Sequence, residues 1–268
     1  MVHTPLAHTR RGAGAPLVLI HGIGHRRQAW DPLVDVLARR YDVIALDLSG
    51  FGESAPYPRG VPYTMDIACE HLAEQFEQWG VERPHVVGNS LGGAIALELG
   101  SRGLASSVTA LSPAGFFGRF DRVQALGILS LLRLTSQVPD RALVAITRTA
   151  IGRWLVGATL YAHPGRHDAA SSLGDALALK RCEGFAGVAR QGLRYAFDRE
   201  VPVPTTVAWG TKDRILPYAQ SARARRVLPD ADHVPLVGAG HVPMADCPEE
   251  IVALIDATVA QVGSTAVA

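Results

Sequence analysis

The residues with the clearest chemical potential are Ser90 and the glycines around it. Residues 85–93 read HVVGNSLGG, in which a short β-branched run ends in Gly-x-Ser-x-Gly and leads into an amphipathic stretch. A strand that enters a helix through a serine forms a nucleophile elbow, a tight turn without room for bulk near the serine. Gly88 and Gly92 meet this requirement. The pattern predicts Ser90 as a nucleophile at a helix N-terminus, where amides and the helix dipole favour an anion.

A serine hydroxyl needs a base to take its proton and an acid to orient that base. His241 lies in the glycine-rich segment GAGHVPM, which follows a predicted strand at 233–237. Asp213 lies in WGTKDRILP, which follows a predicted strand at 205–209. Ligands of open α/β sheets bind at the carboxyl ends of the strands, where both loops would lie. We therefore expect Asp213 to orient His241, and His241 to activate Ser90.

Two other carboxylates remain alternatives for the acid. Asp232 and Asp246 also lie near predicted strand or loop ends. Asp246 has a second interpretation, because with Pro248 and Glu249 it is typical of a helix N-cap that precedes proline and an acidic first turn. Exchanging each aspartate for asparagine would separate these alternatives.

The elements that must position these residues follow the pattern of a mostly parallel sheet with helices on both faces. Predicted strands cover residues 17–20, 43–47, 107–112, 205–209 and 233–237, besides the one that leads to Ser90. Helical periodicity predicts helices over residues 31–40, 64–79, 218–227 and 248–262. The fold class expected from this alternation is α/β.

The rhythm changes after Pro113. From residue 118 to 199 apolar residues recur at helical period, and no strand is predicted. The helical segments are 123–134, 141–160 and 172–194, with breaks expected at Pro139, at Pro164 and Gly165, and at Gly184 and Gly187. We predict a core made of residues 1–117 and 200–268, with a helical insertion at 118–199 that packs over its active face.

Two groups of side chains in or near this insertion have open roles. The aromatic residues either line an apolar pocket or form the core of the insertion; they are Phe116, Phe117, Phe120, Trp154 and Tyr161. The arginines either receive an acidic substrate or form a solvated face; they are Arg119, Arg122, Arg133 and Arg153.

The composition limits the classes of molecule that we expect this protein to bind. The 268 residues carry 26 basic and 25 acidic side chains, so a formal charge of +1 gives no overall attraction to nucleic acid or anionic membranes. Cys69, Cys182 and Cys247 lie far apart, which favours neither a disulfide framework nor a zinc site. No apolar run reaches the roughly 20 residues that span a bilayer, and residues 1–16 lack the pattern of a secretory signal.

These observations predict a cytoplasmic, globular chain that acts on a small molecule. We expect no cofactor, no metal, no nucleic-acid partner and no membrane partner. The oligomeric state stays open.

The chain resembles the α/β-hydrolase superfamily over nearly its whole length. The matching motifs are HGIG at 21–24, DLSGFGES at 47–54, the elbow, and the loops of Asp213 and His241 in the order nucleophile, acid, base. The resemblance implies the α/β-hydrolase fold, with residues 118–199 as a helical cap over the active site. It also implies an oxyanion hole made by the backbone N–H groups of Ile23 and Leu91.

We expect three further polar residues near these motifs to have no part in catalysis. His21 is expected to be a structural hydrogen-bonding residue, as in the superfamily, and Asp47 to fix its loop. His25 flanks the oxyanion loop and is either within reach of the substrate or, as is more usual for a lone loop histidine, solvated.

The serine at the elbow narrows the reaction. Haloalkane dehalogenases and epoxide hydrolases of this fold use aspartate there, so we expect a serine hydrolase that cleaves an ester, thioester or lactone bond through an acyl-enzyme. We expect the substrate to be small and largely apolar.

Several alternatives stay open. The Gly-Asn-Ser-x-Gly-Gly elbow also resembles hydrolases of carbon–carbon bonds in ring-cleavage products. Those enzymes usually have Gly-Pro-Gly after the oxyanion glycine and tryptophan beside the catalytic histidine, whereas this chain has His25-Arg26-Arg27 and Val242. A cofactor-free perhydrolase, or a ligand receptor that retains the triad, also fits.

Overall fold

One mixed sheet of seven strands organises the chain, for which the computed structural model describes residues 4–265 and side chains as far as residue 263. The strand order is β1-β3-β2-β4-β5-β6-β7, and only the pairing of β1 with β3 is antiparallel. The strands are β1 His8–Arg11, β2 Ala15–Ile20, β3 Tyr41–Leu46, β4 His85–Asn89, β5 Ser107–Leu111, β6 Thr205–Gly210 and β7 Asp232–Leu236. The predicted α/β class with a mostly parallel sheet is confirmed.

The central strands are apolar on both faces because both faces are covered. Along β2, Leu17 and Leu19 pack into one hydrophobic cluster, and Val18 and Ile20 pack into the other. Every residue of β4 and β5 is buried. Strands of this kind read as continuous hydrophobic runs, which is why the sequence pattern located them.

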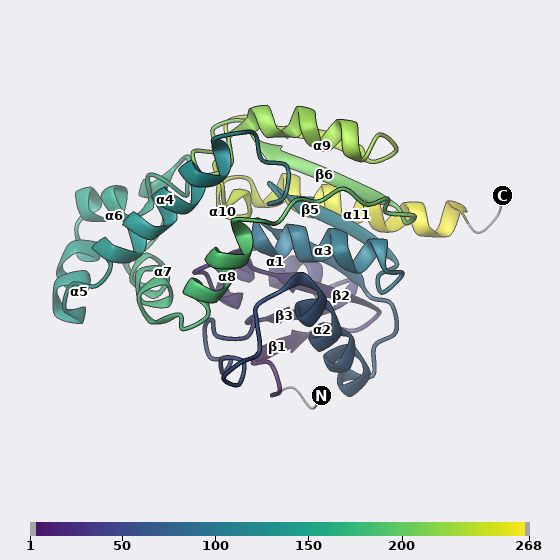
Figure 1. Ribbon diagram of the computed structural model, residues 1–268, viewed down its shortest axis with the longest axis horizontal. Coiled ribbons are helices and arrows are strands. Elements are labelled where there is room, and N and C mark those ends of the chain that lie inside the picture. Colours follow the sequence, from purple (N-terminus) through teal and green to yellow (C-terminus); the bar gives the residue numbers. More distant parts are fainter. Residues whose placement is uncertain (1–3, 266–268) are drawn as a thin grey trace.

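Helices cover the two faces of the sheet (Figure 1). One face packs against α1 (Asp31–Leu37) and α11 (Pro248–Thr265), and the opposite face against α2 (Met65–Trp79), α3 (Leu91–Ser101) and α9 (Ser221–Val227). Shorter elements are η1 Arg27–Trp30, η2 Pro164–Arg166, η3 Tyr218–Gln220 and α10 Pro243–Asp246.

Strand β1 was not predicted. Its four residues, His8 to Arg11, are all exposed at the edge of the sheet. They therefore lack the apolar alternation by which a half-buried strand is recognised. Arg10 forms an ion pair with Asp42 of the neighbouring strand, at 2.5 Å.

Five helices connect β5 to β6 and lie together at one side of the molecule (Figure 1). They are α4 Asp121–Thr135, α5 Asp140–Arg148, α6 Ala150–Gly157, α7 Ala169–Arg181 and α8 Phe185–Gly192. The segment predicted as a helix at 141–160 is two helices, because Thr149 ends α5 and caps α6 by accepting a hydrogen bond from the Gly152 N–H at 3.0 Å.

The break expected at Gly187 was wrong. Gly187 lies inside α8, and the chain breaks before it, between Arg181 and Phe185. A Cβ atom at Gly187 would collide with the ring of Tyr63, so this glycine serves close packing rather than helix termination.

No helix in the described part of the chain combines the length and the apolar character needed to cross a bilayer.

Candidate active site

Ser90 stands in a strained turn between β4 and α3. Its backbone has φ 57° and ψ −113°, outside the regions that L-residues prefer. Glycines on either side make the turn possible, since a Cβ on Gly92 would collide with the carbonyl of Ile20, and one on Gly88 with the carbonyl of Gly92. Ser90 occupies the N-cap position of α3, but its side chain makes no capping hydrogen bond. The hydroxyl is therefore not consumed by a structural role.

His241 and Asp213 are in direct contact. The distance between His241 Nδ1 and Asp213 Oδ2 is 2.7 Å, and both side chains are buried. The other carboxylate oxygen, Oδ1, accepts hydrogen bonds from the N–H groups of Ile215 and Leu216, each at 2.8 Å. A carboxylate held in this way keeps the proton of a neutral imidazole on Nδ1, which leaves Nε2 as a proton acceptor.

Asn89 links the histidine loop to the elbow. Its side-chain amide donates hydrogen bonds to the backbone carbonyl of His241 at 2.9 Å and to that of Leu111 at 3.1 Å. Asn89 immediately precedes Ser90, so these bonds fix the position of the His241 backbone relative to the serine. No local motif predicts this role of Asn89, because its partners lie 22 and 152 residues away in the chain.

The alternative acids lie elsewhere. Asp232 begins β7 and accepts a hydrogen bond from Gln261 at 2.8 Å, at the end of the strand opposite to His241. The N-cap interpretation of Asp246 was wrong. Its carboxylate instead accepts hydrogen bonds from the N–H groups of Gly240, Ala162 and His163, at 2.8 to 3.0 Å.

The residues predicted as oxyanion donors lie beside Ser90. An ideal Cβ on Gly22 would stand 3.1 Å from Ser90 Cβ, so the loop that leads to Ile23 packs against the elbow. Leu91 is the first residue of α3, and its N–H has no acceptor within the helix. Ser90, Ile23 and Leu91 line one cavity.

Two polar residues hold the surrounding loops. His21 is fully buried; its Nδ1 bonds to the Gly22 carbonyl at 2.7 Å, and its Nε2 accepts from the Leu48 N–H at 3.0 Å. Burial lowers the pKa of His21 to about 4, so the ring is neutral at pH 7. Asp47 accepts hydrogen bonds from the backbone N–H groups of Arg27 and Glu53.

The expectation that His25 is solvated was wrong. His25 is buried, its Nδ1 accepts from the Arg26 N–H at 3.0 Å, and its Nε2 lies 3.3 Å from the hydroxyl of Tyr161. The Tyr161 hydroxyl in turn donates to Asp175 at 2.8 Å. This chain of contacts joins the oxyanion loop to α7, a connection that the sequence could not show.

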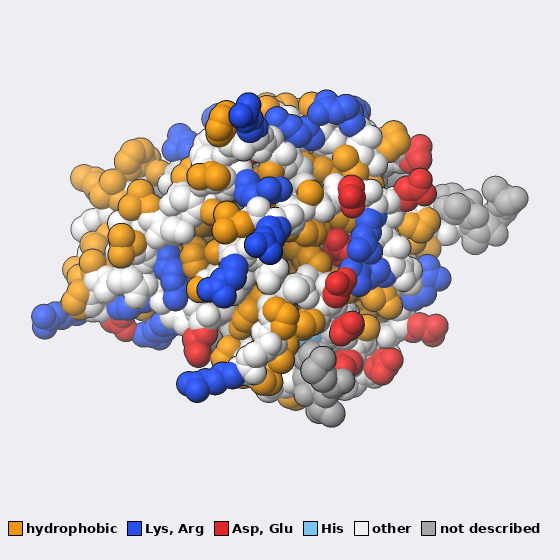
Figure 2. Space-filling model, in the orientation of Figure 1, with side chains coloured by type: hydrophobic (Ala, Val, Ile, Leu, Met, Phe, Trp, Pro, Cys, Tyr) orange, Lys and Arg blue, Asp and Glu red, His pale blue; other side chains and the backbone are white. Residues whose placement is uncertain are grey.

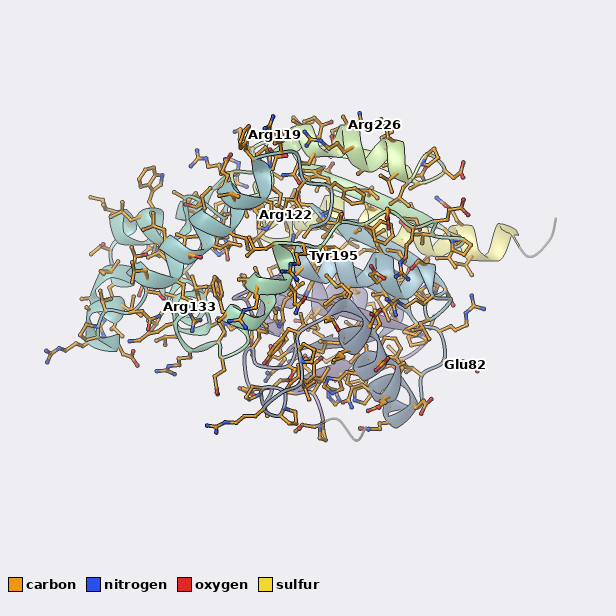
Figure 3. The ribbon with its side chains drawn as sticks, viewed as in Figure 1. Glu82, Arg119, Arg122, Arg133, Tyr195 and Arg226 are labelled. Carbon is orange, nitrogen blue, oxygen red and sulfur yellow. The ribbon has the colours of Figure 1, made fainter. Side chains whose placement is uncertain are left out.

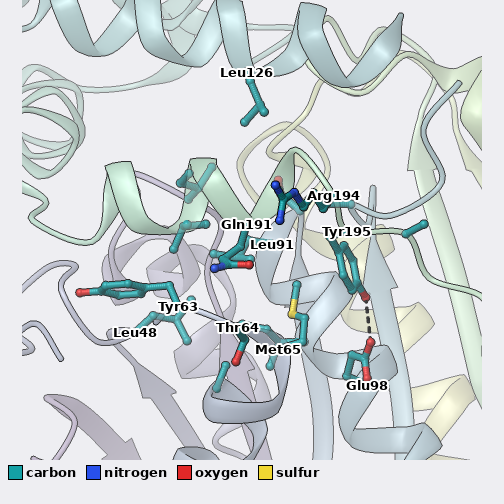
Figure 4. Close-up of a pocket in the computed structure, with 18 of the residues that line it drawn as sticks. Leu48, Tyr63, Thr64, Met65, Leu91, Glu98, Leu126, Gln191, Arg194 and Tyr195 are labelled. Atoms are coloured by element: carbon teal, nitrogen blue, oxygen red, sulfur yellow. Dashed lines mark hydrogen bonds between the residues drawn. The ribbon is translucent and has the colours of Figure 1, made fainter. Parts of the chain in front are cut away.

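The cavity at Ser90 has a volume of about 370 Å³ and extends along α3 (Figure 4). Leu91, Ile95, Glu98 and Arg102 line it at the spacing of one helix face. Eight residues of helix separate Ser90 from Glu98, a distance of about 12 Å. Apolar side chains form much of the wall, and the far end is polar, where the Tyr195 hydroxyl donates to Glu98 at 3.2 Å. The site suits an elongated, mainly apolar molecule.

A second cavity of about 370 Å³ lies among the helices α4 to α7. It shares Ile23 and Leu129 with the first cavity. Its wall is largely aliphatic, and the pair of Tyr161 and Asp175 belongs to its polar part.

The aromatic and basic residues of the insertion divide between roles. Phe117 lines the cavity at Ser90, and Phe116 and Tyr161 are buried. Phe120 and Trp154 are 72% and 54% exposed, so neither expectation holds for them.

The arginines do not share one role either. Arg122 and Arg133 donate to the backbone carbonyls of Tyr195 and Leu179, at 2.8 and 2.9 Å, and Arg153 donates to that of Thr147 at 3.1 Å. These three arginines brace helices, and only Arg119 fits the expected solvated face.

Within residues 4–265 no group of three or more His, Cys, Asp or Glu side chains is arranged to hold a metal ion. Cys69, Cys182 and Cys247 are free thiols.

Comparison with known proteins identifies the family that shares this architecture. The model described as the alpha/beta hydrolase family matches residues 17–254. The chain belongs to the alpha/beta hydrolase family. This membership confirms the superfamily that the sequence motifs indicated.

Relatives of this alpha/beta hydrolase have varied names. The dihydrolipoyllysine-residue acetyltransferase component of the acetoin cleaving system from Cupriavidus necator is 31% identical over 85% of this chain, which spans 61% of that relative. The 2-hydroxy-6-oxo-6-(2'-aminophenyl)hexa-2,4-dienoic acid hydrolase from Metapseudomonas resinovorans is 29% identical over 89% of this chain and 82% of its own. A solved bacterial membrane phospholipase A has a TM-score of 0.75 and 26% identity, covering 96% of this chain and 83% of that one.

Proposed function

We propose that this alpha/beta hydrolase is a serine hydrolase that cleaves an ester-type bond through an acyl-enzyme on Ser90. The observation that carries the proposal is the state of Ser90, whose hydroxyl makes no capping bond although its backbone is strained and its side chain faces a cavity. Strain of this kind is maintained where function requires it. The contact between His241 and Asp213 supplies the base and its orienting acid.

The proposed mechanism has two halves. In the first, Ser90 Oγ attacks the carbonyl carbon as His241 Nε2 takes its proton, and the oxyanion accepts hydrogen bonds from the Ile23 and Leu91 N–H groups. His241 then gives the proton to the leaving group, and the acyl-enzyme remains. In the second, His241 activates water, which attacks the acyl carbon and releases the acid. Asp213 stabilises the imidazolium in both halves.

The cavity supports a substrate class. Its apolar wall and its extension along α3 suit an acyl or alcohol part that is elongated and apolar. We propose an ester, a thioester or a lactone of that kind, with residues 118–199 acting as the cap that shields the reaction from water. The cytoplasmic location expected from the sequence is part of the same proposal.

A second candidate reaction is the hydrolysis of a carbon–carbon bond in a ring-cleavage product. It is favoured by the similarity to the Metapseudomonas resinovorans hydrolase and by the Asn89 that precedes the nucleophile. The same Ser90 and His241 would serve that reaction, so the triad does not separate the two candidates. A substrate comparison does.

The test is hydrolysis of p-nitrophenyl esters with butanoyl, octanoyl and dodecanoyl groups, beside a vinylogous 1,5-diketone as the carbon–carbon substrate. We expect turnover of the esters, highest for a chain longer than butanoyl, and loss of turnover in Ser90→Ala with an unchanged melting temperature. Turnover of the diketone alone would favour the second candidate. A single slow turnover with product retained would favour a receptor, and no reaction with any ester would contradict the proposal.

A further inference from the structure

The insertion has an unusually apolar outer surface. Nine of the thirteen large hydrophobic side chains that are exposed among the described residues fall between residues 120 and 155. They are Phe120, Val123, Leu131, Leu134, Val138, Ile146, Ile151, Trp154 and Leu155, which we call the outer apolar surface. Figure 2 shows hydrophobic side chains gathered over this side of the molecule. A concentration of exposed apolar side chains of this kind indicates an interaction site for a protein, a membrane or a ligand.

These side chains are arranged along the helices. On α4, Val123, Leu131 and Leu134 are exposed, while Ala125 and Leu129 on the other side of the helix are buried. On α6, Ile151, Trp154 and Leu155 follow the same helical spacing. Helix α4 is thus apolar on its outer side as well as on its inner side, and α6 presents large apolar side chains to the outside. Packing within the protein accounts for the inner side only.

The same segment is basic. Residues 118–160 contain six arginines and two aspartates, a formal charge of +4, so the rest of the chain carries −3. Both aspartates are engaged, Asp121 by Arg223 at 2.8 Å and Asp140 by Lys180 and Arg181. Arg119 precedes α4, and Arg122 and Arg133 belong to it (Figure 3). Arg122 and Arg133 are half-buried and donate to backbone carbonyls, whereas Arg119, Arg141 and Arg148 are exposed. The net charge of +1, from which we expected no membrane partner, does not show that positive charge is concentrated in residues 118–160 and negative charge in the rest of the chain.

The second cavity reaches this surface. Ile146 and Leu155 line the cavity and also belong to the outer apolar surface. At its inner end the cavity is lined by Ile23, which also lines the cavity at Ser90. Ile23 and Leu129 therefore separate the second cavity, which reaches the outer surface of the insertion, from the cavity that contains Ser90.

We propose that the outer apolar surface docks on a lipid surface that carries anionic headgroups. Exposed apolar side chains enter the interface while arginines attract the headgroups, which is the combination found in interfacial helices. A second copy of this chain fits less well, because a symmetric interface would bring the arginines of both copies together with both aspartates already paired. Under the proposed function, which this last step requires, the second cavity is the route by which an apolar substrate passes from the lipid, past Ile23 and Leu129, to Ser90.

The experiment measures flotation of the full chain with vesicles of phosphatidylcholine alone, or of equal parts phosphatidylcholine and phosphatidylglycerol. The Ser90→Ala chain is measured in parallel, so that binding is scored without hydrolysis. We expect both chains to float with the anionic vesicles and to bind those without phosphatidylglycerol at least tenfold more weakly.

Two pairs of variants locate the surface. Ile151→Asp with Trp154→Asp removes binding, whereas Val36→Asp, at an exposed valine of α1 outside the insertion, leaves it unchanged. Arg141→Gln with Arg148→Gln weakens binding about tenfold or more, since one basic side chain contributes roughly a factor of five. Arg225→Gln with Arg226→Gln, on α9, changes it little. Melting temperature and soluble-ester hydrolysis check that each variant is folded.

Three results would overturn the proposal. They are an absence of flotation with anionic vesicles, equal flotation of the Ile151→Asp, Trp154→Asp variant and the parent, and a dimer in sedimentation that this variant dissociates while no vesicle binding is seen. None of them depends on turnover. Vesicle binding without ester hydrolysis would instead leave the docking surface standing and contradict the proposed function.

Discussion

Two aspartates hold the loop of His241, and they do so in different ways. Asp213 contacts the imidazole itself at 2.7 Å, whereas Asp246 accepts the backbone N–H of Gly240, one residue before the histidine. The first contact orients the imidazole ring. The second joins the loop to Ala162 and His163 of the insertion.

Exchange of each aspartate for asparagine separates these roles. In Asp213→Asn we expect kcat for an ester to fall roughly 10³-fold or more, because the amide cannot stabilise an imidazolium, with little change in KM. In Asp246→Asn we expect a loss of about 1–3 kcal/mol in the free energy of unfolding, since one of the three backbone N–H groups that bond to the carboxylate loses its acceptor. Steady-state kinetics and urea unfolding measure the two effects. Near-normal activity in Asp213→Asn with loss in Asp246→Asn would show that the acid is misassigned.

His21 makes stability depend on pH. Its pKa of about 4 in the folded chain lies below the ordinary value of 6.5. The contribution of neutral His21 to the free energy of unfolding is therefore complete above pH 6.5 and is lost as the pH falls toward 4. The reason is that the unfolded chain takes up a proton at a higher pH than the folded chain does. The loss amounts to roughly 3 kcal/mol.

Urea unfolding at pH 7 and pH 4.5 measures this effect. The shorter amide of His21→Asn can replace the hydrogen bond to Gly22 but does not reach Leu48, so we expect this variant to be less stable at pH 7 but to lose less stability on acidification. An equal loss in parent and variant would mean that other groups cause the pH dependence.

The elbow is the element in which sequence and structure agree most closely. Strand β4, Gly88, Ser90 and Gly92 form a local pattern with its own steric reason, so they could be located from the sequence alone. The polar edge strand β1 could not, because its pairing with β3 depends on the rest of the sheet. The break at Thr149 lacks the glycine or proline that usually marks one.

Gly92 tests the elbow as an element. Its Cβ position is occupied by the carbonyl of Ile20 in β2, so Gly92→Ala forces backbone to move. We expect a loss of about 3 kcal/mol or more in unfolding free energy, together with loss of activity. Gly127→Ala on α4 is the matched control, because nothing lies within 4 Å and alanine favours helix by about 1 kcal/mol. Equal melting temperatures for both variants would contradict the steric account.

In the whole molecule, the three loops predicted to carry the site meet at one edge of the sheet, but the sequence did not predict how the insertion contacts them. Ser90, Asp213 and His241 follow parallel strands, and strand order brings such loops to one edge. The contacts of His25 with Tyr161 and of Asp246 with Ala162 join segments more than 80 residues apart. No periodicity or local motif encodes such pairs. The exposure of Phe120 and Trp154 likewise depends on how five helices pack.

Covalent labelling with a fluorophosphonate, followed by peptide mass spectrometry, shows directly whether Ser90 is the nucleophile. We expect one adduct per chain, located on Ser90, absent in Ser90→Ala and formed far more slowly in His241→Ala. A folded chain that forms no adduct, or that carries the adduct on another residue, would contradict the assignment of Ser90 as the nucleophile.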